Sequence, residues 1–166
     1  MPWFGSWPSD ALRRAEQALD DLEEVVVSLD PDTDDAVVNA LSRFLVVRAC
    51  GYLEQVFGLC LRAHFQAHAH QRVATYASAV LGRGSNPNPN YLIDTLRNID
   101  PDWASELTEF LNTDSQRLRN DVKFLVAARN KIAHGESETI GRRRAQSLVR
   151  TTREVADWLI RRLDPR

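Results

Sequence analysis

The segment LRNDVKFLVAARNKIAHG, residues 118–135, holds the residue types best suited to chemistry on a phosphate group. Its apolar positions recur at spacings of four, three, four and three residues, which predicts one stripe of a helix, formed by Leu118, Val122, Leu125, Arg129 and Ile132. Arg129 therefore stands where the pattern calls for an apolar residue. A buried cation without a partner is costly. We expect Arg129 either to pair with a structural anion or to face a site or interface that receives one.

His134 is the second candidate in this segment. Gly135 is typical of the position just past a helix end, so His134 is expected in the last turn, where exposed carbonyls attract an imidazolium. The rise between Arg129 and His134 is about 7 Å, so both side chains could reach one phosphate group. Asn130 lies four residues before His134 and shares a face of the helix with it. Histidine exchanges protons near neutral pH and arginine binds phosphate through paired hydrogen bonds.

Glu54 lies between Gly51 and Gly58 in a long apolar segment that precedes this motif. Glycine inside a helix costs about 1 kcal/mol relative to alanine, which predicts a close approach by another element here. Glu54, or Arg48, could support Arg129 or His134. The structural alternative, which we favour, is a buried ion pair that holds the helices in register, and Arg129 would be the partner of Glu54 in that pair.

Charge is distributed unevenly along the chain. Residues 1–35 carry a net charge of −8, residues 36–113 are neutral and residues 114–166 carry +6, although the whole chain has only −2. Of the 21 cationic side chains, 19 are arginine, which suits phosphate. This asymmetry indicates an anionic partner for the C-terminal third. The alternative is that the acidic first helix packs beside the basic last one.

Helical periodicity dominates the sequence and no useful strand alternation occurs. We expect an all-α bundle of four to five main helices plus short ones, in a single domain spanning 1–166, with a loop at 82–90. The two cysteines share one apolar segment, which argues against a disulfide framework. We see no secretory signal and no apolar run that spans a membrane, so we predict a cytoplasmic location without a membrane partner. The predicted helices cover about residues 10–29, 36–68, 71–81, 91–98, 102–112, 115–134 and 139–163.

Two further groups of residues have less specific interpretations. Cys60, His64 and His68 are spaced so that they could chelate zinc, but the segment is typical of a polar helix end and has no second cluster to complete a site, so we predict no metal. An aromatic N-terminal arm, residues 1–8, contains Trp3, Phe4 and Trp7. It is expected to cover the bundle, to clasp a partner chain or, least of all, to stack on bases.

The motif RNKIAHG, residues 129–135, resembles the signature of the HEPN superfamily: an arginine, a polar residue, three more residues and a histidine. RACGYLEQVF, residues 48–57, resembles the Arg-…-Glu stretch on an earlier helix of such domains. The layout, with a long second helix, a Gly/Pro/Asn loop, short helices, the motif helix and a last helix, is most similar to RiboL-PSP-type HEPN domains. The resemblance covers about residues 36–163.

This resemblance implies a metal-independent endoribonuclease that needs no cofactor and acts as a homodimer. The RNA 2′-hydroxyl would attack the adjacent phosphate. His134 would transfer protons, Arg129 would bind the phosphate and stabilise charge, and Asn130 would orient His134 or the substrate. RNA contacts are assigned to Arg142, Arg143, Arg144 and Lys131. A subset of the superfamily carries a regulatory tyrosine just beyond the histidine, and this chain has none at Gly135-Glu136-Ser137.

The resemblance also implies a biological setting. We expect the toxin or effector of a toxin–antitoxin or anti-phage system, with an antitoxin or defence-system partner protein. The alternative function is a non-catalytic HEPN module that binds RNA, a nucleotide or a partner protein.

Overall fold

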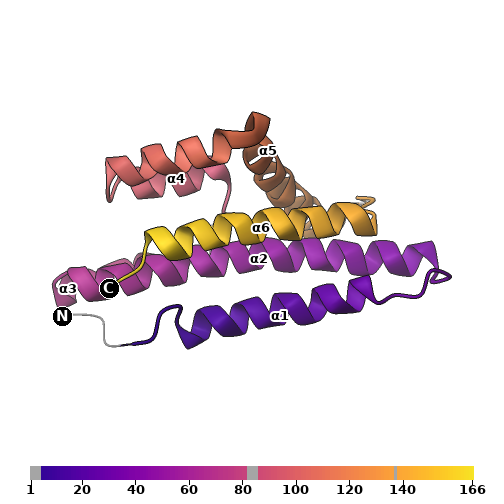
Figure 1. Ribbon diagram of the computed structural model, residues 1–166, viewed down its shortest axis with the longest axis horizontal. Helices are drawn as coiled ribbons and strands as arrows, with labels where there is room; N and C mark the ends of the chain where they lie inside the picture. The colour runs from indigo at the N-terminus through magenta and orange to yellow at the C-terminus, as the bar shows by residue number, and fades with distance from the viewer. Residues whose placement is uncertain (1–4, 82–85, 137) are drawn as a thin grey trace.

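The computed structural model describes residues 5–81, 86–136 and 138–166, and these residues form six helices and no strand (Figure 1). The all-α fold class is therefore confirmed. The helices are α1 (Asp10–Val27), α2 (Asp35–His68), α3 (Gln71–Leu81), α4 (Pro89–Arg97), α5 (Pro101–Ala133) and α6 (Arg142–Arg162).

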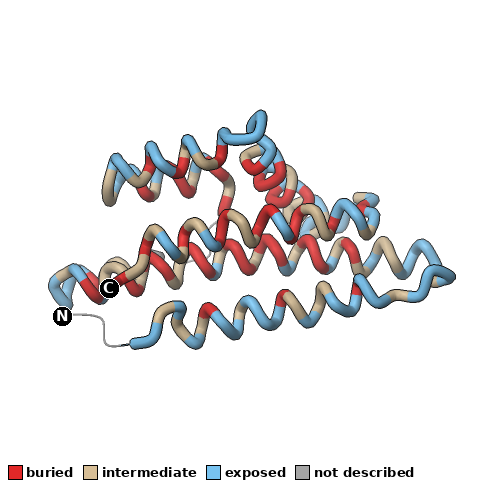
Figure 2. Tube along the Cα trace, viewed as in Figure 1, coloured by how far each residue is buried: buried red, intermediate tan, exposed pale blue. Residues whose placement is uncertain are grey.

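The longest helix, α2, is the centre of the bundle. It contacts α1, α3, α5 and α6, and α1 and α6 flank it in Figure 1. Its buried residues extend almost from end to end, as the red segments in Figure 2 show. An 18-residue window of α2 has a mean hydropathy of 1.5, apolar enough for a membrane span by length and composition, and 56% of that window is buried inside the protein. Such burial is typical of a central core helix.

Helix α5 is broken in the middle. Thr113 has a non-helical backbone, and Asp114, Ser115 and Gln116 have φ values of 50°, 53° and 64°. Left-handed backbone is unfavourable for residues other than glycine, by about 1–2 kcal/mol each. The break therefore separates two helices, which the sequence predicts at 102–112 and 115–134. The first half of α5 pairs with α4, and the second half runs on to the end of the Arg129–His134 motif (Figure 1).

The last helix begins later than the sequence predicts. Residues 139–141 are not helical, and α6 begins at Arg142. The reason is a tertiary contact: Ile140 is buried and its backbone N–H donates to Asn39 Oδ1 on α2, at 2.9 Å. This contact fixes the loop that follows His134 against the first half of α2.

Some charges of the acidic N-terminal segment and of the basic C-terminal third pair with each other within the bundle. Arg153 on α6 pairs with Asp20 and Glu23 of α1, at 2.5 and 2.6 Å. The acidic first helix thus does pack beside the basic last one. Trp7 of the aromatic arm packs against the core and donates from Nε1 to the carbonyl of Ile160, at 2.9 Å. Trp3 and Phe4 lie outside the described residues.

Asp121 is a buried charge that joins α5 to α6. Its Oδ1 lies 2.9 Å from Arg144, its Oδ2 accepts a hydrogen bond from Thr151 at 2.8 Å, and the residue is 7% exposed. The Arg144 guanidinium also lies over the Phe124 ring, 4.7 Å from its centroid. Arg144 is therefore committed to packing.

We predict that Asp121→Ala lowers the free energy of unfolding by about 2 kcal/mol, because two hydrogen bonds to a charged, buried acceptor are lost. Arg144→Ala should cost less, about 1 kcal/mol, since its side chain is 42% exposed. Urea unfolding measures both. Arg143→Ala is the control and should stay within about 0.5 kcal/mol of the parent. An Asp121→Ala protein as stable as the parent would contradict this role.

His64 links α2 to the first half of α5. Its ring meets Trp103 edge to face at 4.9 Å, and among the described residues its Nδ1 is a buried atom without a hydrogen-bond partner. Burial lowers the pKa of His64, the neighbouring His68 lowers it further, and Asp100 opposes the shift. The native protein therefore holds this imidazole neutral.

Because the pKa of His64 is lower in the native than in the unfolded chain, acidification favours unfolding. We predict that the free energy of unfolding decreases as the pH falls through the ordinary histidine range, about 6.5, and below it. The decrease should be smaller in His64→Gln and unchanged in His70→Gln, which removes an exposed histidine nearby. Equal pH profiles for the parent and His64→Gln would show that His64 does not cause the effect.

Candidate functional site

The sequence motif lies at the end of α5, on a surface that solvent reaches. His134 is the C-cap residue that follows that helix, and its backbone N–H donates to the carbonyl of Asn130 at 3.0 Å. Gly135 follows with a φ of +77°, a conformation that glycine adopts without strain. The turn at Gly135 stops the helix and leaves the His134 side chain exposed.

Arg129 lies one turn earlier and is half-buried. Its Nη1 donates to Asn130 Oδ1 at 3.2 Å, and within the described part of the chain it forms no ion pair. The predicted ion pair between Arg129 and Glu54 is therefore wrong. A half-buried guanidinium whose only hydrogen-bond partner is a neutral amide keeps its positive charge available for an anion.

Glu54 and Arg129 nevertheless lie close to the same buried atom, the Cys50 thiol. Burial raises the pKa of Cys50 to about 11, the positive charge of Arg129 lowers it, and the negative charge of Glu54 raises it. Helices α2 and α5 thus bring Glu54 and Arg129 into one neighbourhood without a direct contact. The close approach predicted at Gly51 is wrong, because a Cβ added there would have no neighbour within 4 Å.

Asn130 has a different partner from the one we expect from the sequence. Its side-chain oxygen accepts from Arg129, so in this structure it orients the arginine rather than His134. The link from Asn130 to His134 runs through the backbone, as the last hydrogen bond of the helix.

Arg43 is a site residue that sequence reasoning missed. It donates to the carbonyl of Glu136, two residues after His134, at 3.3 Å, and its Nε is a buried atom without a described partner. Arg43 lies seven residues before Cys50 and eleven before Glu54, so all three share one face of α2. That spacing is the signal in the sequence that would have found it.

Arg48 does not join this neighbourhood. Six residues separate it from Glu54, which places the two about 120° apart around α2, on opposite edges of its buried stripe. Arg48 instead lines a groove between α1 and α2, together with Arg14 and Arg62. Its assignment as a supporting residue of the motif therefore does not agree with its position.

The four cations assigned to RNA contact differ in whether they already bind a partner within the protein. Lys131 pairs with Glu138 at 2.9 Å, and this hydrogen bond raises the pKa of the lysine. Arg142 donates to the carbonyl of Leu29 at 3.3 Å, and Arg144 binds Asp121. Arg143 is exposed and, among the described residues, has neither a hydrogen bond nor an ion pair.

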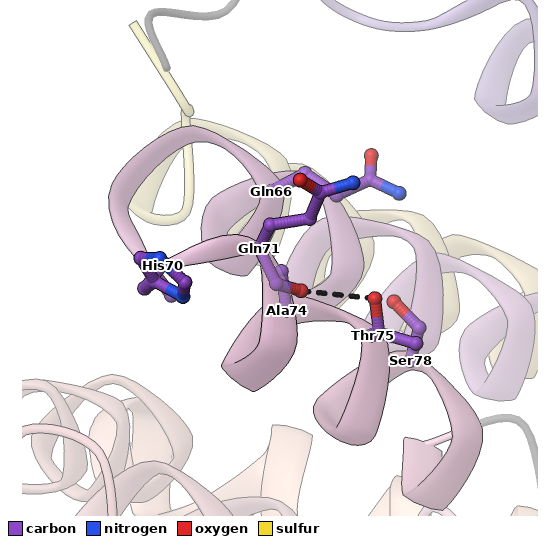
Figure 3. Close-up of a pocket in the computed structure, with 7 residues that line it drawn as sticks. Gln66, His70, Gln71, Ala74, Thr75 and Ser78 are labelled. Atoms are coloured by element: carbon purple, nitrogen blue, oxygen red, sulfur yellow. Dashed lines mark hydrogen bonds between the residues drawn. The ribbon is translucent and has the colours of Figure 1, made fainter.

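Another hollow of the described surface lies away from the motif, at the corner between α2 and α3 (Figure 3). It has a volume of about 670 Å³ and an almost wholly neutral lining. Thr75 on its wall donates back to the carbonyl of Gln71, at 2.9 Å. Apart from His70, the lining contains no ionisable side chain. Its residues are Gln66, Ala69, His70, Gln71, Ala74, Thr75 and Ser78.

In the cysteine–histidine series on α2, the centroids of the His64 and His68 rings lie 4.5 Å apart, but the structure does not show Cys60 with them. Cys60 is fully buried, whereas His64 packs on Trp103 and His68 is exposed. The described residues contain no group of three or more histidine, cysteine, aspartate or glutamate side chains that could hold a metal ion.

Comparison with known proteins agrees with the motif and the fold. The family model for the RiboL-PSP-HEPN domain matches residues 10–163, nearly the whole chain. The protein belongs to this family, and the predicted membership of the HEPN superfamily is confirmed. No curated protein and no solved structure gives a match to this chain.

Both cysteines should be inert in the native protein. Burial raises the pKa of Cys50 to about 11 and that of Cys60 to about 12, so neither thiol ionises at pH 8. We predict no rapid reaction with 5,5′-dithiobis(2-nitrobenzoate) at pH 8, and reaction of two thiols per chain in guanidinium chloride. Fast reaction of one thiol in the folded protein would show that the core around it opens.

Proposed function

We propose that this protein is a metal-independent endoribonuclease of the HEPN type. The observation that carries the proposal is the pair at the end of α5: a half-buried Arg129 without a carboxylate partner and an exposed His134. Transesterification of RNA needs proton transfer near neutral pH and cationic donors aimed at the phosphate. These two side chains supply both.

In the proposed reaction, the 2′-oxygen of a ribose bonds to the adjacent phosphorus and the bond from phosphorus to the 5′-oxygen breaks. One imidazole accepts the proton of the 2′-hydroxyl, and a second imidazolium donates a proton to the leaving 5′-oxygen. Arg129 binds the phosphate and stabilises the negative charge that develops on it, while Asn130 holds the guanidinium in place. The products are a 2′,3′-cyclic phosphate and a 5′-hydroxyl.

The two proton transfers call for two histidines, and each chain contributes one at this site. We propose that a two-fold homodimer brings two copies of His134 to one cleft, since symmetric dimers are the commonest assemblies. Exposure of His134 at a helix end leaves it open to a second chain. Arg43, fixed to the loop after His134, adds positive charge to the same cleft.

We further propose that the nuclease acts in the cytoplasm as the toxin or effector of a toxin–antitoxin or anti-phage system. A partner protein would then restrain it, because an RNase of broad range harms its own cell. The family membership supports this role.

Cleavage of labelled RNA by purified protein in EDTA tests the activity. We predict that His134→Ala and Arg129→Gln each reduce the rate by about 10²-fold or more, because a proton-transfer group or a charge-stabilising donor is lost. Both variants should unfold in urea close to the parent midpoint, since neither residue forms an ion pair with any residue that the structure describes. A DNA oligomer of the same sequence lacks the 2′-hydroxyl and should remain intact.

His70→Ala and Arg150→Gln are matched controls, because both side chains are exposed and lie on other helices or turns. Each should cleave at the parent rate and leave cyclic phosphate ends. If the parent binds RNA but leaves varied RNAs intact, the nuclease proposal fails and the alternative, a non-catalytic HEPN binding module, is correct. Equal loss in the controls would point to a contaminating nuclease.

A further inference from the structure

A second basic surface lies away from the motif, in a groove between α1 and α2. The groove has a volume of about 420 Å³, and three arginines line it: Arg14 from α1, and Arg48 and Arg62 from α2. Between the arginines, the lining contains three alanines of α1 and one leucine of α2. The remaining lining residues are Ala11, Ala15, Ala18, Gln55 and Leu59.

None of the three arginines has a hydrogen bond or an ion pair within the described residues, whereas most other described arginines do. Acidic partners are available on α1, but Asp20 and Glu23 bind Arg153 of α6 instead. Three like charges around one hollow repel each other. An anion bound in the groove would therefore balance the positive charge of these arginines.

The spacing of the arginines favours an extended anion. Arg48 and Arg62 are fourteen residues apart on one face of α2, a distance of about 21 Å along its axis. The two side chains start from α2 at positions this far apart, so successive phosphates of one strand match their spacing better than a single phosphate group does. The alanine and leucine side chains of the lining offer an apolar surface to sugars and bases. Arginine binds phosphate oxygens through paired hydrogen bonds.

We propose that this groove binds the phosphate backbone of an RNA strand, at a site separate from the Arg129–His134 motif. The identity of the strand as RNA rests on the proposed function. The groove and the motif lie on opposite edges of the buried stripe of α2. A substrate that reaches both would therefore have to wrap around the bundle. The groove then contributes affinity without taking part in the reaction.

The test compares two triple variants of equal charge in the full chain carrying His134→Ala, which prevents cleavage. The groove variant is Arg14→Gln/Arg48→Gln/Arg62→Gln. The matched control is Arg72→Gln/Arg150→Gln/Arg161→Gln, three exposed arginines without described side-chain partners on α3 and α6. Binding of a fluorescent single-stranded RNA is measured by anisotropy at several salt concentrations.

We expect the groove variant to bind about tenfold more weakly at moderate salt. Each lost phosphate contact removes about 0.7 from the slope of log affinity against log salt, so the slope should decrease by about 2. The control should keep the parent slope. DNA of the same sequence should show the same dependence on the groove, because phosphates alone are contacted. In the catalytically intact chain, the groove variant should raise KM and leave kcat unchanged.

Several outcomes would overturn the proposal. Equal losses in the groove and control variants would show that net charge alone matters. Stronger competition by polyglutamate than by RNA of equal charge would assign the groove to an acidic protein, and equally strong competition by tripolyphosphate would assign it to a compact anion. An intact groove effect together with absent cleavage would instead remove the nuclease proposal and leave the groove standing. Absence of any RNA binding would remove both.

Discussion

The packing of four helices onto α2 is the constraint on which the rest of the structure depends. A helix buried along one broad stripe carries its charged residues at the edges of that stripe and on the face opposite it. One edge of α2 carries Arg43 and Glu54 towards the end of α5, and the other carries Arg48 and Arg62 towards α1. The positions of the candidate catalytic site and of the arginine groove thus both follow from the way in which the other helices pack on α2.

The arginines discussed above form two groups, which differ in whether a carboxylate on a neighbouring helix pairs with the guanidinium. Arg144 and Arg153 bind carboxylates on neighbouring helices, and these ion pairs hold α6 against α5 and α1. Arg129 and the groove arginines have no such carboxylate among the described residues. The first group stabilises the bundle, whereas the second leaves positive charge without a described carboxylate partner. The net positive charge of the C-terminal third is therefore only partly available to a ligand.

Most helices were predictable, because apolar periodicity and local capping signals reflect interactions within a few residues. Asp34 caps α2 and Asn88 caps α4 through their own side chains, as their positions before apolar runs suggest. The start of α6 was not predictable. It depends on Asn39, about one hundred residues away in the chain, which binds the backbone of Ile140. The role of Arg48 was mistaken for the same reason, since its distance from Glu54 around the helix matters only once both neighbours of α2 are known.

The sequence by itself determined the all-α class, the family signature and the placement of Arg129 and His134 near one helix end, since spacing along a single helix decides these features. Only the tertiary structure decided which of the charged side chains pair. In the folded protein Asp121 pairs with Arg144, and Arg129 donates to the neutral amide of Asn130. Arg14, Arg48 and Arg62 line one groove. The physical reason is that an ion pair requires contact within a few ångströms, and contacts between helices follow from packing rather than from local sequence.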